Sequence, residues 1–212
     1  MEITYIAHSS FVLKDTKGRT VVTDPYTPDI GYKPYTGTAD IVTISHHHPD
    51  HDYIDEIKGN PKILDKVGFF NEADIPIKGI LSYHDNASGS LRGVNIIYVF
   101  EMEGYKICHL GDLGTSITEK LIAEIGNIDV LMIPVGGNYT LDGKEAAQVC
   151  KLIKSPIVIP MHYKTPYIDF PISGVEDFIS NMKTGKKLNS NTLMLQEKPI
   201  STNEVLIFDI SN

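Results

Sequence analysis

The run HHHPDH over residues 46–51 places four imidazoles and a carboxylate in one short stretch of chain. The run directly follows Asp40–Ser45, whose apolar and β-branched side chains predict a buried strand. In α/β proteins, chemistry tends to gather at the carboxyl ends of strands. We therefore expect an α/β fold that holds this strand end rigidly.

The geometry of an extended chain divides the run into two parts. Alternate residues point the same way, so His46 and His48 should face one point while His47 turns away. A turn after His48 can bring Asp50 and His51 round to the same point. Imidazole and carboxylate groups suit Zn²⁺, Mn²⁺ or Fe²⁺, so these four residues predict a metal site, and we assign His47 no role. The alternative is a solvated polar loop or an accidental polyhistidine run.

Four further histidines, His8, His84, His109 and His162, stand at or just beyond the ends of expected strands or in the following loops. From such positions a rigid scaffold can aim several side chains at one point. Each of the four also has a plainer interpretation, because a single histidine at a strand end is often a hydrogen-bonded structural residue.

Short β-rich runs separated by turn residues predict most of the strands. An opening meander is expected over Glu2–Ala7, Phe11–Lys14 and Thr20–Thr23, and later strands over Val94–Phe100, Lys106–Leu110, Val130–Val135, Ile157–Pro160 and Val205–Ile210. The segment Lys62–Leu81 is too mixed to assign. A turn at Glu103-Gly104 should join the first two of the later strands.

Capping boxes, in which Ser or Asp is followed three residues later by Glu, predict three helices. The pairs are Ser116 with Glu119, Asp142 with Glu145, and Ser173 with Glu176. An apolar face follows each of them at helical spacing. A meander followed by alternating strands and helices predicts sheets with helices packed outside.

Composition limits the classes of partner. With 212 residues, 42% of them hydrophobic, the chain can bury a sizeable core, and we expect one domain over residues 1–212. No stretch approaches the roughly 20 apolar residues of a membrane span, and the start lacks the pattern of a signal peptide, so we expect a cytoplasmic protein without a membrane partner. A formal charge of −8 argues against nucleic acid.

The pattern H-x-H-x-D-H after a strand resembles the signature of the metallo-β-lactamase superfamily. Further matches follow in order: Asp24 in VVTDP, His84 in SYHD, Asp112 in GD and His162 in IPMHY. More narrowly, the phrases AHSSF, HLGDLG, PVGGNYT and PMHYKT resemble predicted metal-dependent hydrolases related to L-ascorbate-6-phosphate lactonase.

This resemblance implies a four-layer αβ/βα sandwich, with two mixed β-sheets packed face to face and helices outside. It also implies two divalent metal ions, with Zn²⁺ preferred over Mn²⁺ or Fe²⁺. The implied ligands are His46, His48 and His84 for one metal and Asp50, His51 and His162 for the other, with Asp112 bridging them. His109, three residues before Asp112, remains the alternative to His84.

Other residues are expected to support the ligands or to contact substrate. They are Asp24, His8, His109, Arg92, Asn138 and Tyr163. For His8 a buried structural histidine is an equally good interpretation, and for Arg92 a structural ion pair is. Asp50 and Asp112 are the candidates for passing a proton during catalysis.

The function that these expectations favour is hydrolysis of an ester bond by a metal-bound hydroxide shared between two metals. The substrate would be a small molecule, either a phosphodiester or phosphate ester, or a lactone; a homo-oligomer is left open. One alternative is a di-iron oxidoreductase of the flavodiiron type, although those proteins usually carry Glu where His48 stands and add a flavin domain. The other alternative is a non-catalytic metal-binding module.

Overall fold

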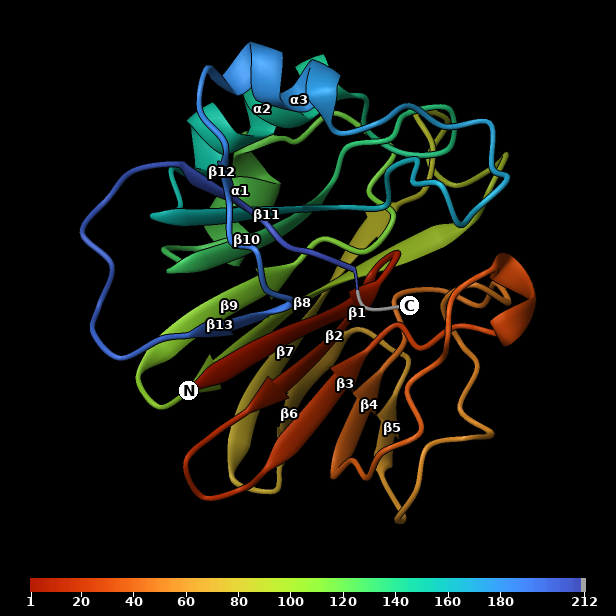
Figure 1. Cartoon of the computed structure of the whole chain (residues 1–212), viewed down its shortest axis with the longest axis vertical. Helices are drawn as coiled ribbons and strands as arrows, with labels where there is room; N and C mark the ends of the chain where they lie inside the picture. The colour runs from red at the N-terminus through yellow and green to blue at the C-terminus, as the bar shows by residue number, and fades with distance from the viewer. Residues whose placement is uncertain (211–212) are drawn as a thin grey trace.

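The structure is a computed structural model that describes residues 1–210. Its strands form two mixed sheets packed face to face (Figure 1). In spatial order, the six-stranded sheet consists of β13 (Thr192–Met194), β1 (Glu2–Ala7), β2 (Ser10–Lys14), β3 (Thr20–Thr23), β4 (Ile41–Thr43) and β5 (Lys62–Leu64). The eight-stranded sheet consists of β12 (Lys186–Lys187), β14 (Glu204–Ile207), β11 (Ile157–Met161), β10 (Val130–Pro134), β9 (Tyr105–His109), β8 (Val94–Met102), β7 (Ile75–Tyr83) and β6 (Gly68–Glu72). The α/β sandwich predicted from the sequence is confirmed.

The segment Lys62–Leu81, which the sequence left unassigned, lies in β5, β6 and β7. It crosses from the six-stranded sheet to the eight-stranded one, and it has no single period because β7 buries residues on both faces, Ile77 between the sheets and Ile80 toward the helices. The sequence also gave no sign of β13, the short strand that pairs antiparallel with β1 and closes the edge of the six-stranded sheet.

The main core lies between the two sheets. Residues at every second position of β1 are buried, including Ile3 and Tyr5, as the period of a strand requires. They belong to one hydrophobic cluster with Tyr98, Phe100 and Ile159 of the eight-stranded sheet.

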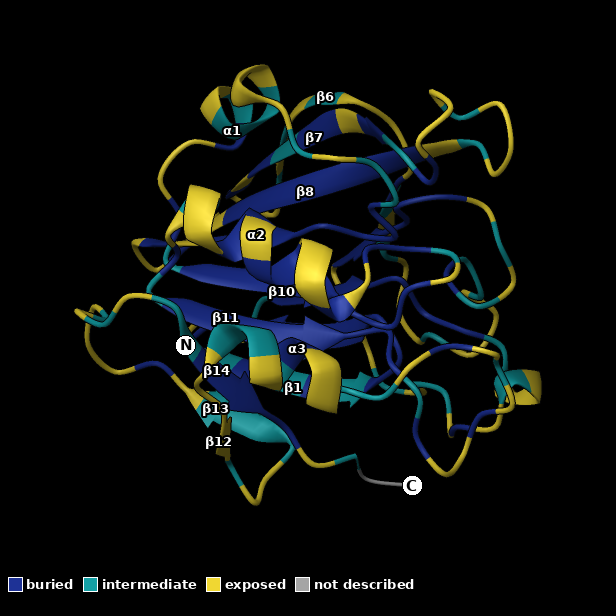
Figure 2. Ribbon diagram, turned by 90° about the horizontal axis from the view of Figure 1, so that it is seen from above, coloured by how far each residue is buried: buried dark blue, intermediate teal, exposed yellow. Residues whose placement is uncertain are grey.

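Helices cover the other face of the eight-stranded sheet (Figure 2). They are α1 (Glu119–Ile125), α2 (Gly143–Ile153) and α3 (Glu176–Met182). The capping box of α2 forms as predicted: Asp142 Oδ1 accepts from the Glu145 backbone N–H at 2.8 Å, and Glu145 Oε2 accepts from the Asp142 N–H at 3.0 Å.

The other two predicted caps are wrong. Helix α1 begins after Thr118, whose hydroxyl accepts from the Leu121 N–H at 3.2 Å, and the Ser116 N–H donates to the Asn86 side chain. Helix α3 begins after Val175 with no side-chain cap. Ser173 is held by backbone bonds from its N–H to Gly136 and from Lys164 to its carbonyl, so it belongs to a loop pairing.

The sequence predicted helices outside both sheets, but an irregular segment covers the outer face of the six-stranded sheet. Val12, Val22 and Val42 pack there against Ala39 and Tyr35 of the irregular segment between β3 and β4. The only helical turn in that segment, as described, is a 3-10 turn over Pro28–Ile30. Within residues 1–210 the α-helices therefore lie on one side of the sandwich. None of them is long and apolar enough to cross a bilayer.

A buried hydroxyl links the two sheets. Tyr98 lies on β8, and its hydroxyl donates to the carbonyl of Leu64 at 2.8 Å and lies 3.3 Å from that of Ile44, both on the side of the six-stranded sheet. Because these atoms are shielded from water, losing the hydroxyl removes a hydrogen bond that solvent cannot replace.

We predict that Tyr98→Phe lowers the free energy of unfolding by about 1 to 2 kcal/mol, measured by urea denaturation. The matched control is Tyr105→Phe, because the Tyr105 ring is similarly buried but its hydroxyl makes no hydrogen bond within residues 1–210. The control should change stability by less than about 0.5 kcal/mol. Equal effects of the two substitutions would contradict a link between the sheets through Tyr98.

Candidate metal centre

Parallel strand directions bring the candidate ligands to one end of the sandwich. Strands β1, β3 and β4 run the same way in one sheet, and β7, β9 and β11 run the same way in the other. The residues just beyond the carboxyl ends of these strands are His8, Asp24, the 46–51 run, His84, Asp112 and His162. Strands far apart in sequence therefore deliver their polar residues to one place.

Asp112 lies at the centre of this group and is buried. Its Oδ2 atom is 3.2 Å from the Nε2 atoms of His84 and His162, 3.4 Å from that of His51 and 4.0 Å from that of His46. One carboxylate oxygen thus faces four imidazole nitrogens contributed by three other loops.

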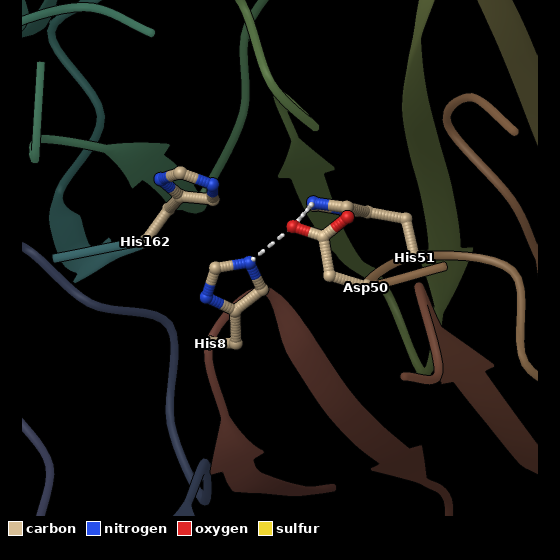
Figure 3. Close-up of side chains that lie close together, drawn as sticks. All are labelled: His8, Asp50, His51 and His162. Carbon is tan, nitrogen blue, oxygen red and sulfur yellow. Dashed lines mark hydrogen bonds and ion pairs between the residues drawn. The ribbon is translucent and has the colours of Figure 1, made fainter. Parts of the chain in front are cut away.

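The surrounding donors form two groups. His46, His48 and His84 can place ligand atoms within 4.8 Å of one another, and so can His8, Asp50, His51 and His162. In the second group the Asp50 carboxylate lies between His8 and His51, with His162 beside them (Figure 3). The structure thus brings together all seven residues expected as ligands, and it adds His8 to the second group.

The central atoms fit a divalent metal. Nε2 of His46, Nε2 of His51 and Oδ1 of Asp112 are buried and have no hydrogen-bond partner. Leaving such atoms unpaired costs roughly 1 to 3 kcal/mol each, so a set of them at one point needs a ligand. Neutral imidazoles with carboxylates are the donor set that Zn²⁺, Mn²⁺ and Fe²⁺ share.

Asp24 orients two of the imidazoles from behind. Its Oδ2 atom is 2.9 Å from Nδ1 of His51 and 2.5 Å from the Ser45 hydroxyl, which in turn lies 2.9 Å from Nδ1 of His46. Holding the Nδ1 atoms in this way turns both Nε2 atoms toward Asp112. Asp24 is fully buried, so these bonds are shielded from solvent.

The structure separates His109 from His84. Nε2 of His109 is bonded to the Ser9 carbonyl at 2.8 Å, and its Nδ1 accepts from the Gly111 N–H at 3.2 Å, so neither nitrogen is available. His84 has its Nδ1 on the Tyr139 carbonyl at 2.9 Å and directs its Nε2 toward Asp112. His84 therefore fits the first group and His109 does not.

Several residues of the site adopt a backbone conformation that is uncommon for side-chain-bearing residues. The φ angles are 56° at His8, 40° at Asp24 and 51° at His162. Such conformations cost of order 1 kcal/mol or more each and tend to cluster where function requires them. Gly111, with φ 55°, is needed for space as well, because a Cβ there would lie 2.6 Å from Cβ of Ser45.

A cavity of about 210 Å³ opens beside these groups. It is lined by His48, Asp50, His84, Arg92, Asp112, Tyr139, His162 and Phe170. Tyr139 and Phe170 were not expected from the sequence. Tyr139 could have been found, since it lies in the phrase PVGGNYT, whereas nothing in the sequence marks Phe170.

Two expected substrate contacts lie elsewhere. The Asn138 side chain donates to the Pro171 carbonyl at 2.9 Å and does not line the cavity. Tyr163 is buried in the cluster between the eight-stranded sheet and the helices. In both cases the neighbouring residue, Tyr139 or His162, takes the position at the cavity. His47 points outward with 63% of its side chain exposed, within 3.2 Å of Asp52.

Comparison with known proteins agrees with this geometry. Residues 2–162 match the family described as the beta-lactamase superfamily domain. The chain belongs to this superfamily. A metal-dependent hydrolase from Methanospirillum hungatei is 32% identical in an alignment of 188 positions that covers 78% of this chain and 84% of the relative. Another from Carboxydothermus hydrogenoformans is 28% identical over 84% of this chain and 91% of its own length.

A solved structure from Thermotoga maritima covers 99% of both chains at 40% identity and a TM-score of 0.85. The Thermotoga maritima protein is described as a zinc-dependent hydrolase of the metallo-β-lactamase superfamily. The relatives that the chain matches at this level are thus metal-dependent hydrolases, and the superfamily predicted from the sequence is confirmed. The narrower relation to ascorbate-6-phosphate lactonase stays a prediction.

The electrostatics of this superfamily site differ between the ligands. Burial lowers the pKa of His51 and His84, but the Asp112 carboxylate outweighs it and raises both, so these imidazoles must lose a proton when a metal binds. Burial, together with the charge of His51, lowers the pKa of His46 to about 3, so this imidazole is neutral at physiological pH. Burial opposes ionisation of Asp112, but the charges of His162 and His51 outweigh it and hold the pKa of that carboxyl well below its usual range. A neutral imidazole and an ionised carboxylate are the forms that bind metal.

We predict that Asp24→Asn weakens binding of a divalent metal by about 10- to 100-fold, because the amide cannot hold His51 and Ser45 together as the carboxylate does. Zinc affinity would be measured by competition with a chromophoric chelator. Asp40→Asn is the matched control, since Asp40 binds the Thr20 N–H at 2.8 Å, near the opposite ends of β3 and β4. Unchanged zinc affinity in Asp24→Asn would refute the supporting role of Asp24.

Proposed function

We propose that this metal-dependent hydrolase binds two divalent ions, preferably Zn²⁺, and cleaves an ester bond of a small molecule. His46, His48 and His84 would hold one ion, and Asp50, His51 and His162 the other. Asp112 would lie between them. The observation that carries the proposal is the single Asp112 oxygen within 3.2 to 4.0 Å of four imidazole nitrogens drawn from both groups.

When bound, such ions polarise the scissile carbonyl or phosphoryl oxygen and make water a stronger nucleophile at neutral pH. Among the chain's own groups, Asp50 is placed to accept the proton of the attacking water. Its Oδ2, 3.1 Å from Nε2 of His8 and 3.5 Å from Nε2 of His51, is the oxygen that would hold the ion, which leaves Oδ1 for the proton. Asp112 is too enclosed by imidazoles for this role, and its ionised form holds the centre together.

The cavity supports a small substrate. Its volume of about 210 Å³ is below the roughly 300 to 1,000 Å³ of typical drug-sized sites. A phosphate ester or a lactone, as the resemblance to ascorbate-6-phosphate lactonase implies, is of suitable size. Phe170 forms an apolar part of the wall and limits the water that reaches the reacting atoms.

The main rival is a di-iron oxidoreductase. A diiron β-hydroxylase from Streptomyces venezuelae matches with a TM-score of 0.57, but its 13% identity shows the fold alone. The histidine at position 48 favours the hydrolase, because flavodiiron proteins usually carry Glu there. A protein that retains iron in preference to zinc and is red-brown as purified would favour the rival.

We predict that chelation removes hydrolysis of a panel of phosphodiesters, phosphate esters and lactones, and that Zn²⁺ or Mn²⁺ restores it. Asp112→Asn and His48→Ala should lower kcat/KM on any active ester by about 100-fold or more and lower metal content. His47→Ala is the matched control within the same run, because this side chain points outward, and it should retain both.

Two results would contradict the proposal. One is full metal content and full hydrolytic rate in Asp112→Asn. The other is inactivity of fully metallated protein across the whole panel, which would favour a non-catalytic metal-binding module.

A further inference from the structure

We propose that Arg92 binds an anionic group of the substrate, a carboxylate or phosphate that lies outside the scissile bond. The protein would then be selective for small esters that carry an oxyanion. This inference rests on the proposed function, since it names the substrate class of the same cavity.

Arg92 is the one lysine or arginine among the residues that line the cavity in the described chain. Its guanidinium lies over the Tyr139 ring, 4.4 Å from the ring centre, and no carboxylate pairs with it among residues 1–210. The other arginine of the chain, Arg19, is paired with Asp15 at 2.5 Å and donates to the carbonyls of Ala73 and Asp74. Arg92 alone keeps its planar set of N–H donors unused, and that set matches carboxylate and phosphate.

The loop that carries Arg92 is fixed in advance. Asp85 Oδ1 accepts from the N–H groups of Ala87 and Gly89 at 2.7 and 2.9 Å, and its Oδ2 accepts from those of Leu91 and Arg92 at 3.0 and 2.8 Å. Four backbone bonds to one carboxylate leave this loop little freedom. With its backbone fixed and its guanidinium stacked on Tyr139, Arg92 loses less entropy when it binds an anion.

Tyr139 relates this arginine to the metal centre. Its ring supports the Arg92 guanidinium, while its backbone carbonyl accepts from Nδ1 of His84 at 2.9 Å. The position of the guanidinium is therefore tied to that of a candidate metal ligand. An anion on Arg92 would hold the rest of a small substrate against the metal centre, as a positioning contact requires.

The positive charge of Arg92 would favour anionic esters over neutral ones. The chain has a formal charge of −8, so its average field repels anions. A local cation in the cavity reverses that repulsion at one point. Neutral esters would lack this attraction and would bind through the rest of the cavity alone.

The activity test compares two esters with the same leaving group, mono(4-nitrophenyl) succinate and 4-nitrophenyl butyrate, on metal-loaded protein. Arg92→Gln should lower kcat/KM for the anionic ester by about 10- to 100-fold and change that for the neutral ester by less than about twofold. Arg92→Lys should fall between, and Arg19→Gln, the matched control, should leave the ratio of the two unchanged. The substitution spares the loop, because Asp85 binds the backbone of Arg92 and not its side chain.

A second measurement does not depend on activity. Succinate and inorganic phosphate are titrated calorimetrically into metal-free protein, and Arg92→Gln should weaken binding of the preferred anion by about 10- to 100-fold. The tighter of the two anions identifies the source of the oxyanion. Equal binding by wild type and Arg92→Gln, or an equal loss on both esters, overturns the inference.

The two proposals fail in distinguishable ways. If chelation does not reduce hydrolysis, the proposed function fails, whereas anion binding by metal-free protein still reports on Arg92. If chelation abolishes hydrolysis but Arg92→Gln leaves the preference for the anionic ester unchanged, the function stands and the role of Arg92 is refuted.

Discussion

A buried carboxylate facing four imidazoles is the constraint on which the rest of the site depends. The Oδ2 atom of the buried Asp112 side chain lies within 3.4 Å of the Nε2 atoms of His51, His84 and His162. Such an arrangement is costly unless every group is satisfied, since buried unpaired polar atoms are penalised. A divalent cation would satisfy them together, and the unpaired atoms of His46, His51 and Asp112 converge on the place where it would lie.

The architecture of the sandwich brings the groups of this site together. Its two sheets share a large apolar core, and strands that run in the same direction within each sheet end at the same edge. Ligands from β4, β7, β9 and β11 therefore meet although they are up to 116 residues apart in sequence, from His46 to His162. Behind them, the Asp24 carboxylate holds the far side of the His51 ring and the Tyr139 carbonyl that of the His84 ring, which fixes the positions of the donor atoms.

The cavity wall shares residues with the metal centre. The carbonyl of Tyr139 binds His84, and the ring of Tyr139 contacts Arg92. Asp85, which binds the backbone of Arg92, directly follows His84 in the chain. Residues that fix the metal centre are thus neighbours of those that shape the cavity. If Arg92 binds substrate as proposed, two short loops would link substrate recognition to the geometry of the centre.

The sequence by itself predicted a metal site at the 46–51 run, because residue type and spacing are local properties of the chain. The roles of His84, Asp112 and His162 and the sandwich of two mixed sheets were implied by the resemblance to the metallo-β-lactamase superfamily. Only the tertiary structure separated His84 from His109, because both stand at strand ends. Both ring nitrogens of His109 are bonded to backbone groups, whereas His84 keeps its Nε2 directed toward Asp112. The structure likewise shows that the cavity is lined by Tyr139 and Phe170, and not by Asn138 and Tyr163. Which of two adjacent side chains faces a cavity depends on long-range packing, and no local pattern in the sequence records it.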